Sequence, residues 1–223
     1  MRGLQTALQK DPKCSRAYRD LATLSNLHGN FPQCVEYATK SLTIPGANPE
    51  ALRQRAIAYS HMNRLADAVK DINDYIAQGH PAATNYMLRG DFQRAMKQYA
   101  EAAASYQKAL DVAVGAGKYQ ERCFNQLVKC LELQSKFTEI DALLTKELAK
   151  DKRNFELLDL RGQYRMKDKK IAAALDDFTA ALNVEPASAF YEHRAAAYDA
   201  LGRKKEAEQD RVAGKKAVSK DFL

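Results

Sequence analysis

Glycine and proline are scarce in this sequence, with 10 and 6 residues among 223. Proteins built from many short strands need such residues at their frequent turns, so an all-β fold is disfavoured. The sequence also lacks an apolar run of about 18 residues, the length that a transmembrane helix requires. Its start does not show a basic segment followed by an apolar one, as a secretory signal would. We therefore expect no transmembrane segment.

The four cysteines form no recognisable disulfide or metal-binding pattern. Cys14, Cys34, Cys123 and Cys130 include no CxxC pair, and no histidine lies at zinc-finger spacing from them. Cys123 and Cys130 lie seven residues apart, on one face of a helix. Free thiols that are at least partly buried are favoured over disulfides or metal ligands. Such thiols fit a reducing compartment, so we expect a cytoplasmic protein without a metal or cofactor.

The charge balance is basic, with 35 lysines and arginines against 28 acidic residues and a net charge of +7. This excess permits contact with acidic proteins, nucleic acid or anionic lipid. The two signs are mostly interspersed, as on the solvated surface of helices. Apolar residues make up 46% of the chain, which is enough for a continuous core.

Residues that carry catalysis do not converge anywhere in the sequence. The four histidines are scattered, and none stands in an HExxH motif. The glycines of residues 115–117 lack the Lys-Ser/Thr that follows a phosphate-binding loop, and no GxSxG or SxxK occurs. We therefore expect neither an enzyme nor a small-molecule substrate.

A pattern of large and small residues recurs six times along the chain, with a period near 34 residues. The units begin near Ser15, Pro49, Ala83, Glu121, Phe155 and Ser188. The fourth residues are large: Tyr18, Leu52, Tyr86, Phe124, Leu158 and Tyr191. The eighth are small in five units of six: Ala22, Ala56, Gly90, Val128, Gly162 and Ala195. The twentieth are again small in five: Cys34, Ala68, Ala102, Ile140, Ala174 and Ala207.

The clearest unit runs from Phe155 to Pro186 and reads as two amphipathic helices joined by a tight turn. Its small, large and helix-stopping residues, Gly162, Phe178 and Pro186, fall at offsets that resemble a tetratricopeptide repeat. The resemblance implies an all-α fold, a right-handed α-solenoid of stacked helix–turn–helix repeats. The expected segments are 1–12 (the second helix of a partial repeat or a cap), 13–46 (repeat 1), 47–80 (repeat 2), 81–118 (repeat 3), 119–152 (repeat 4), 153–186 (repeat 5) and 187–223 (repeat 6).

Close packing explains the small positions. The eighth and twentieth residues should face each other where the two helices of a repeat cross, and large side chains there would separate the helices. Repeat 3 is about four residues longer than the others, which indicates either an extended loop or a hinge; we favour the loop. In repeat 6, Arg211 and Gly214 replace a large and a small residue, as expected of a polar C-terminal capping helix.

Four repeats carry arginine at the seventh position, and three of these have aspartate sixteen residues later. A partly desolvated guanidinium needs a partner, and its fork matches a carboxylate. We therefore predict structural ion pairs between the two helices of a repeat: Arg55–Asp71, Arg161–Asp177 and Arg194–Asp210. Repeat 4 has Leu127 and Leu143 at these positions, and repeat 3 has Arg89 with Ser105.

The resemblance also implies where a partner would bind. The second, fifth, ninth and twelfth residues of each repeat would line a concave groove that holds an extended peptide or a helix. The candidate residues carried over are Arg16, Arg19, Thr23, Asn26, Arg53, Ile57, Met87, Arg94, Arg122, Asn125, Lys129, Asp159, Gln163 and Glu192. They are basic in the earlier repeats and acidic in the last two, so we predict a ligand with an acidic segment over the basic end.

Members of this family that capture chaperone tails use a clamp of lysine, arginine and asparagine residues. At those positions repeats 1 to 3 have Arg19, Thr23, Gln54, Thr84 and Leu88, of which only the first keeps the charge. A chaperone C-terminal tail is therefore disfavoured. The favoured function is a scaffold or adaptor that binds another protein. The alternatives are a helical repeat that binds nucleic acid or an anionic surface, and the interaction domain of a larger enzyme or secretion component.

Overall fold

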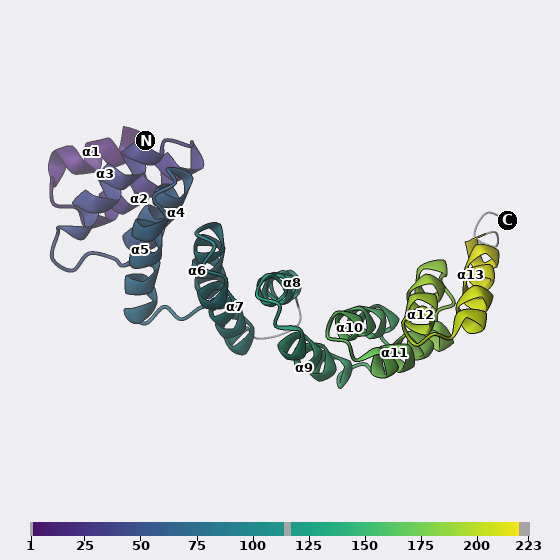
Figure 1. The fold of residues 1–223 in the computed structure, drawn as a ribbon. Coiled ribbons are helices and arrows are strands. Elements are labelled where there is room, and N and C mark those ends of the chain that lie inside the picture. Colours follow the sequence, from purple (N-terminus) through teal and green to yellow (C-terminus); the bar gives the residue numbers. More distant parts are fainter. Residues whose placement is uncertain (1, 114–116, 219–223) are drawn as a thin grey trace. The chain divides into compact units, whose positions relative to one another are not determined.

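The computed structural model describes residues 2–113 and 117–218, which form α-helices and no β-strand (Figure 1). The predicted all-α solenoid fold is confirmed. The helices are α1 (Arg2–Lys10), α2 (Ser15–Leu27), α3 (Phe31–Leu42), α4 (Glu50–His61), α5 (Leu65–Ala77), α6 (Ala83–Ala95), α7 (Tyr99–Val112), α8 (Lys118–Leu133), α9 (Phe137–Leu148), α10 (Phe155–Lys167), α11 (Ile171–Val184), α12 (Ser188–Ala200) and α13 (Lys204–Val218).

Each of the six predicted repeats contains two helices, and residues 1–12 contain α1 alone. The extended loop expected in repeat 3 falls largely on residues 114–116, which lie outside the described residues; helix α7 itself has 14 residues, as α11 does. Among the described helices, none combines the length and apolar character needed to cross a membrane.

The chain divides into two compact units, Met1–Cys130 (unit 1) and Leu131–Leu223 (unit 2), with the division inside α8. In unit 1, α2 packs on α3, α4 on α5 and α6 on α7 within repeats, while α3–α4 and α5–α6 contacts join neighbouring repeats. In unit 2, α10 packs on α11 and α12 on α13, and α9–α10 and α11–α12 contacts join the repeats. In these pairs the second helix of one repeat contacts the first helix of the next, which is how a solenoid builds a continuous core.

The small positions of the repeat are buried as predicted. All six twentieth residues, from Cys34 in repeat 1 to Ala207 in repeat 6, have no exposed surface. At the eighth position the glycines face an aromatic ring of the second helix: a Cβ on Gly90 would lie 2.8 Å from Tyr106 Cε1, and one on Gly162 would lie 2.8 Å from Phe178 Cδ1. The twenty-fourth residue, rather than the twentieth, is thus the nearest neighbour of the eighth in these two repeats.

In repeats 3 and 5 the glycine at the eighth position makes room for an aromatic ring at the twenty-fourth. Glycine stands opposite a ring in repeats 3 and 5, whereas alanine stands opposite Ala38 in repeat 1 and Ile72 in repeat 2. The phenyl ring of Phe178 is 1% exposed, so no solvent-filled space remains around it. Since protein interiors are close-packed, the two positions must be chosen together.

The turn between the two helices of a repeat has the same conformation in all six repeats. Its fifteenth residue has a positive φ each time: Gly29, Asn63, Lys97, Ser135, Lys169 and Gly202. A left-handed residue at this point ends the first helix and satisfies its last carbonyl groups. Only two of the six are glycine, so four turns hold a side chain in a conformation that costs L-residues about 1 kcal/mol.

The four cysteines are free thiols, as predicted. Cys34, Cys123 and Cys130 are buried, and burial raises the pKa of the Cys34 thiol to about 12. Because the thiolate is the reactive species, these side chains act as small core residues rather than nucleophiles. Among the described residues, no cluster of three or more His, Cys, Asp or Glu side chains could hold a metal ion.

The first prediction concerns the tight contact in repeat 5. We expect Gly162→Ala to lower the free energy of unfolding, because a clash with Phe178 of about 1–3 kcal/mol exceeds the helix propensity gained, about 1 kcal/mol. Urea unfolding followed by circular dichroism measures the change. Gly3→Ala, where a Cβ meets no atom within 4 Å, is the matched control and should not destabilise.

A double-mutant cycle tests the cause. Gly162→Ala should cost less in a Phe178→Leu background than in the wild type, because the smaller side chain frees the space that the new methyl group needs. Equal costs in both backgrounds would contradict the packing explanation.

Candidate partner-binding surface

All three predicted ion pairs are formed, and each is bidentate. Arg55 Nε and Nη2 donate to Asp71 at 2.6 and 2.9 Å. Arg161 donates to Asp177 at 3.0 and 2.6 Å, and Arg194 to Asp210 at 2.7 Å twice. The aspartates are 3–5% exposed, so each pair is largely desolvated and its geometry is fixed.

Each of these arginines also reaches the preceding repeat. The Nη1 groups of Arg55, Arg161 and Arg194 donate to the hydroxyl groups of Thr39, Thr145 and Thr179, respectively. One guanidinium therefore joins three helices: its own, the second helix of its repeat and the second helix of the repeat before. The sequence analysis missed this third partner. Its signal is a threonine fifteen or sixteen residues before the arginine.

Arg89 keeps this arrangement without a carboxylate. Its Nε donates to Ser105 Oγ at 2.8 Å and its Nη1 to Asn73 Oδ1 at 3.1 Å. Desolvation without a counter-charge lowers the pKa of this guanidinium from its ordinary value. The predicted exception in repeat 3 is therefore a hydrogen-bonded arginine, still positioned between α5, α6 and α7.

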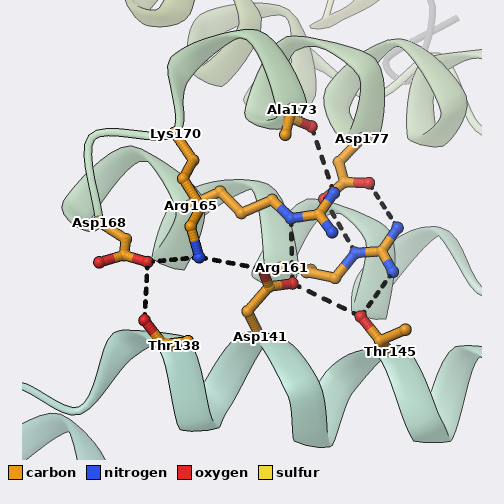
Figure 2. Close-up of polar contacts among 9 residues, drawn as sticks. All are labelled: Thr138, Asp141, Thr145, Arg161, Arg165, Asp168, Lys170, Ala173 and Asp177. Carbon is orange, nitrogen blue, oxygen red and sulfur yellow. Dashed lines mark hydrogen bonds and ion pairs between the residues drawn. The ribbon is translucent and has the colours of Figure 1, made fainter.

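Unit 2 adds a second arginine to the network, which the sequence analysis did not find (Figure 2). Arg165 Nε donates to Asp141 Oδ1 at 3.0 Å, and its Nη1 donates to Asp177 Oδ2 at 2.8 Å. Asp177 thus accepts from both Arg161 and Arg165. Lys170 lies beside Asp168 at 2.7 Å and Asp141 at 3.7 Å. The network fixes α9, α10 and α11 relative to one another.

The candidate binding residues of unit 1 differ in how accessible they are. Arg16 on α2 and Asn125 and Lys129 on α8 are exposed and form no hydrogen bond or ion pair with other described residues. Arg122 is also exposed, with 54% of its side chain accessible, and donates to Asp91 Oδ2 at 2.7 Å. Asp91 accepts a second hydrogen bond from the hydroxyl of Tyr106.

Several other candidates are already engaged within the chain. Arg19 pairs with Asp20 at 2.6 Å, and Arg53 pairs with Glu50 at 3.0 Å. Asn26 Nδ2 donates to the backbone and side-chain oxygens of Gln54, which ties α2 to α4. The Thr23 hydroxyl donates to a carbonyl of its own helix, and Ile57 is half-buried. Of these contacts, that of Asn26 joins two repeats, and those of Arg19, Arg53 and Thr23 lie within a single helix.

Two candidates are buried, so they are not part of an exposed surface. Met87 on α6 is 8% exposed, and Asp159 on α10 is 5% exposed. Two side chains cover Asp159. Gln163 on the same helix donates from Nε2 to its Oδ2 at 2.7 Å, and His193 Nδ1 on α12 of the next repeat lies 2.7 Å from its Oδ1. Arg94 is half-buried, and its Nε has no hydrogen-bond partner. Glu192 remains exposed.

The predicted acidic end is therefore weaker than the sequence indicated. One of its carboxylates, Asp159, is used inside unit 2, and Asp199 pairs with Arg211. The basic residues of unit 1 are the part of the prediction that remains at the surface.

No protein-family model matches the chain, and no curated protein sequence does. Solved structures do match. The C-terminal part of a TPR repeat-containing protein from Cytophaga hutchinsonii aligns with a TM-score of 0.62 and 17% identity, over 91% of this chain and 80% of that one. YrrB, described as a TPR protein with an unusual peptide-binding site, aligns with a TM-score of 0.62 and 14% identity, over 91% of this chain and 97% of that one.

The chain has the tetratricopeptide-repeat fold. A structure of Naa15/Naa10 bound to HypK-THB is also similar, with a TM-score of 0.71 and 19% identity. The alignment covers 94% of this chain but 32% of that one, so the tetratricopeptide repeats of the present chain correspond to about a third of the larger chain.

The second prediction compares two aspartates of these tetratricopeptide repeats. Asp177 neutralises two arginines and Asp210 one. We expect Asp177→Asn to lower the free energy of unfolding by about 3–5 kcal/mol, because two desolvated guanidinium groups lose their counter-charge. Asp210→Asn should cost about 1–3 kcal/mol. Urea unfolding measures both; equal costs would show that Arg165 contributes nothing through Asp177. Asp71→Asn in unit 1 provides a second one-arginine reference.

The third prediction concerns pH. The hydrogen bond to Asp159 raises the pKa of His193 above its ordinary value, although burial opposes the shift. Protonated His193 therefore stabilises the contact between α10 and α12 below the unfolded pKa of about 6.5, and this contribution is lost as the pH rises through the folded pKa.

Urea unfolding of the wild type and of His193→Gln from about pH 5.5 to about pH 8.5 would test this, since that range lies on both sides of the ordinary histidine pKa. The wild type should exceed the variant most at the acidic end, and the difference should shrink as the pH rises. A difference that is independent of pH would contradict the proposed ion pair.

Proposed function

We propose that this chain is a non-catalytic scaffold that binds another protein through the first helices of unit 1. The observation that carries the proposal is the state of Arg16, Asn125 and Lys129. These polar side chains are exposed on α2 and α8 and have no partner among the described residues, whereas the seventh residues of the same two helices, Leu21 and Leu127, are buried in the core. One side of a first helix thus builds the solenoid, and the other remains available.

Two structures with the same fold support a protein ligand. YrrB is described as having a peptide-binding site, and the Naa15/Naa10 structure contains bound HypK-THB. A peptide or a helix from a partner protein therefore fits this fold. A small-molecule substrate and a chaperone tail do not fit the residues of this chain as well, since the clamp positions hold Thr23, Gln54 and Leu88.

The free charges on this surface indicate an acidic ligand segment. Within residues 2–113 and 117–218, Arg16 and Lys129 have no carboxylate partner, and Arg122 is exposed beside Asp91, its one carboxylate partner there. A partner carboxylate could pair with each of them without displacing a contact of the core. Such complementary charges mainly raise the association rate and fix the register of the ligand.

The fourth prediction tests this surface. We would compare the wild type, Arg16→Glu/Lys129→Glu and the control Lys70→Glu/Lys108→Glu, in which the same charge change falls on the second helices α5 and α7 of unit 1. Proteins retained from a lysate of the source would be identified, purified and measured against all three chains. The first variant should lose at least about tenfold in affinity, and the control should bind like the wild type.

Two outcomes would contradict the proposal. Equal affinity of a purified partner for all three chains would place the binding surface elsewhere. Retention of nucleic acid alone, with binding that falls steeply with salt, would favour the nucleic-acid alternative.

A further inference from the structure

Basic residues gather at one end of the helix pairs in unit 2, where the first helix of each repeat turns into the second. We define the turn edge as these residues: Lys136, Lys167, Lys169, Lys170, Arg203, Lys204 and Lys205, with Leu133 and Leu201. They belong to the α8–α9, α10–α11 and α12–α13 turns, which are at the opposite end of the helices from the turns that join one repeat to the next. All of them are exposed.

Contacts between repeats make the turn edge continuous. Tyr164 on α10 donates to Glu132 on α8 at 3.2 Å, and Thr138 at the start of α9 donates to Asp168 at 3.2 Å. On the other side, α10 contacts α12, and Met166 near the end of α10 packs against a core cluster that includes Ala197 of α12. The three turns therefore lie next to one another along unit 2.

The turn edge has an excess of positive charge. Four acidic residues on these segments, Glu132, Glu139, Asp168 and Glu206, pair with Lys167, Lys136, Lys170 and Arg203, respectively. Asp199 near the end of α12 pairs with Arg211 and adds a fifth acidic residue, so the seven basic residues exceed the acidic ones by two. The unpaired groups are Lys169, Lys204 and Lys205, which form no ion pair with other described residues.

Helix capping does not explain the basic residues at these places. Lys136 and Lys170 occupy the N-cap positions of α9 and α11 without a capping side-chain hydrogen bond, and Arg203 directly precedes α13. Ser, Thr, Asp and Asn are the preferred caps, and a positive charge at a helix N-terminus is unfavourable. The same chain uses Asn154 and Asn30 as capping residues for α10 and α3. Lys204 and Lys205 stand in the first turn of α13 without an ion pair to any described residue, which is unfavourable for their own helix and points to a role outside the fold.

Exposed apolar side chains lie among these charges. Leu133, the last residue of α8, is 52% exposed, and Leu201, which follows α12, is 43% exposed. A surface that combines lysines with protruding leucines is typical of proteins that lie on a bilayer, where the apolar groups enter the headgroup region and the cations meet anionic lipid.

We propose that the turn edge of unit 2 docks on an anionic membrane surface, with Lys169, Lys204 and Lys205 over the lipid headgroups and Leu133 and Leu201 inserted between them. This surface differs from the first helices of unit 1, so the inference does not depend on the proposed protein ligand. It requires no membrane-spanning helix.

The residue types favour lipid over the other anionic partners. Where this chain recognises a specific buried carboxylate it uses arginine, as in Arg55, Arg161 and Arg194. Six of the seven basic residues on the turn edge are lysines. The lysine ammonium group is a compact charge without the planar, two-pronged geometry of a guanidinium, and it suits a diffuse layer of phosphate and carboxylate groups. Nucleic-acid single strands need exposed aromatic faces for stacking, but Lys167 covers the ring of Tyr164 and Arg203 that of Tyr198.

The test is binding of the whole chain to phosphatidylcholine vesicles with and without phosphatidylserine, measured by co-sedimentation. We expect the wild type to bind only the vesicles with phosphatidylserine. Lys169→Glu/Lys204→Glu/Lys205→Glu should reduce that binding roughly hundredfold, because each basic residue near an anionic surface adds about fivefold to the binding constant. This variant should fold, since glutamate is favourable in the first turn of α13.

A matched control carries the same charge change at the opposite end of the helices. Lys146→Glu/Lys152→Glu/Arg153→Glu alters exposed residues at the end of α9 and in the connection to α10. It should lose less than about fivefold, because those residues face away from the membrane. A third variant, Leu133→Gln/Leu201→Gln, should weaken binding in a way that persists at high salt, since salt screens only the charges.

Three results would overturn the proposal: equal binding of the wild type to both kinds of vesicle, equal binding of wild type and turn-edge variant, or an equal loss in the control. Binding to a homopolymer RNA but not to the vesicles, abolished by the turn-edge variant, would also overturn it and assign the same lysines to nucleic acid.

Discussion

The distance between the two helices of a repeat is the constraint on which this structure depends. Gly162 has no side chain to hold the helices apart, and the ring of Phe178 occupies the space that a methyl group would need. This close crossing allows a thin layer of side chains to fill the inside of each repeat. It also leaves little apolar surface in any one repeat, so the stack must supply the rest of the core. Size at the eighth position is therefore coupled to size at the twenty-fourth.

The bridging arginine follows from this crossing, because it occupies the position next to the small residue. There a guanidinium is half-buried between two helices and must find a counter-charge. Asp71, Asp177 and Asp210 supply it, and a threonine of the preceding repeat uses the remaining donor. Repeat 4 replaces both charges together with Leu127 and Leu143. A buried pair can be exchanged as a whole for apolar residues at little cost, whereas loss of one member is expensive, and the two alternatives found in this chain are consistent with that rule.

The sequence predicts the parts of the structure that repeat. The small columns and the arginine–aspartate pairs recur at fixed offsets within one helix pair, so periodicity alone reveals them. The sequence does not reveal contacts between repeats that occur once. Arg165 between Asp141 and Asp177 is one case, and His193 on Asp159 is another. Their geometry depends on how far the next repeat is displaced, which no local pattern encodes.

The same reason explains which candidate surface residues were misplaced. Carrying positions over from a family assumes that the fifth residue of a first helix always faces solvent. At Asp159 the following repeat brings His193 close enough to cover the carboxylate, and Met87 is enclosed within unit 1. At the fifth residues of repeats 4 and 6, Asn125 and Glu192, the side chain is exposed and the assumption holds.

Positions within one repeat thus differ in what they tolerate. The seventh and eighth residues have neighbours on two or three helices, so a substitution there disturbs the packing of several helices. The fifteenth residue is exposed, and the fold requires of it only a left-handed backbone. In unit 2 the sixteenth residues, Lys136, Lys170 and Arg203, each pair with an acidic residue. Lysine and serine fill the fifteenth position in three of six repeats although glycine would strain less, and bases occupy the N-cap that follows in unit 2. Core packing does not determine which residues stand at these turns. Their charge can therefore be set by a ligand outside the molecule. The unpaired lysines of the turn edge therefore indicate contact with an external ligand. The buried arginines are explained by the contacts that they make within the fold.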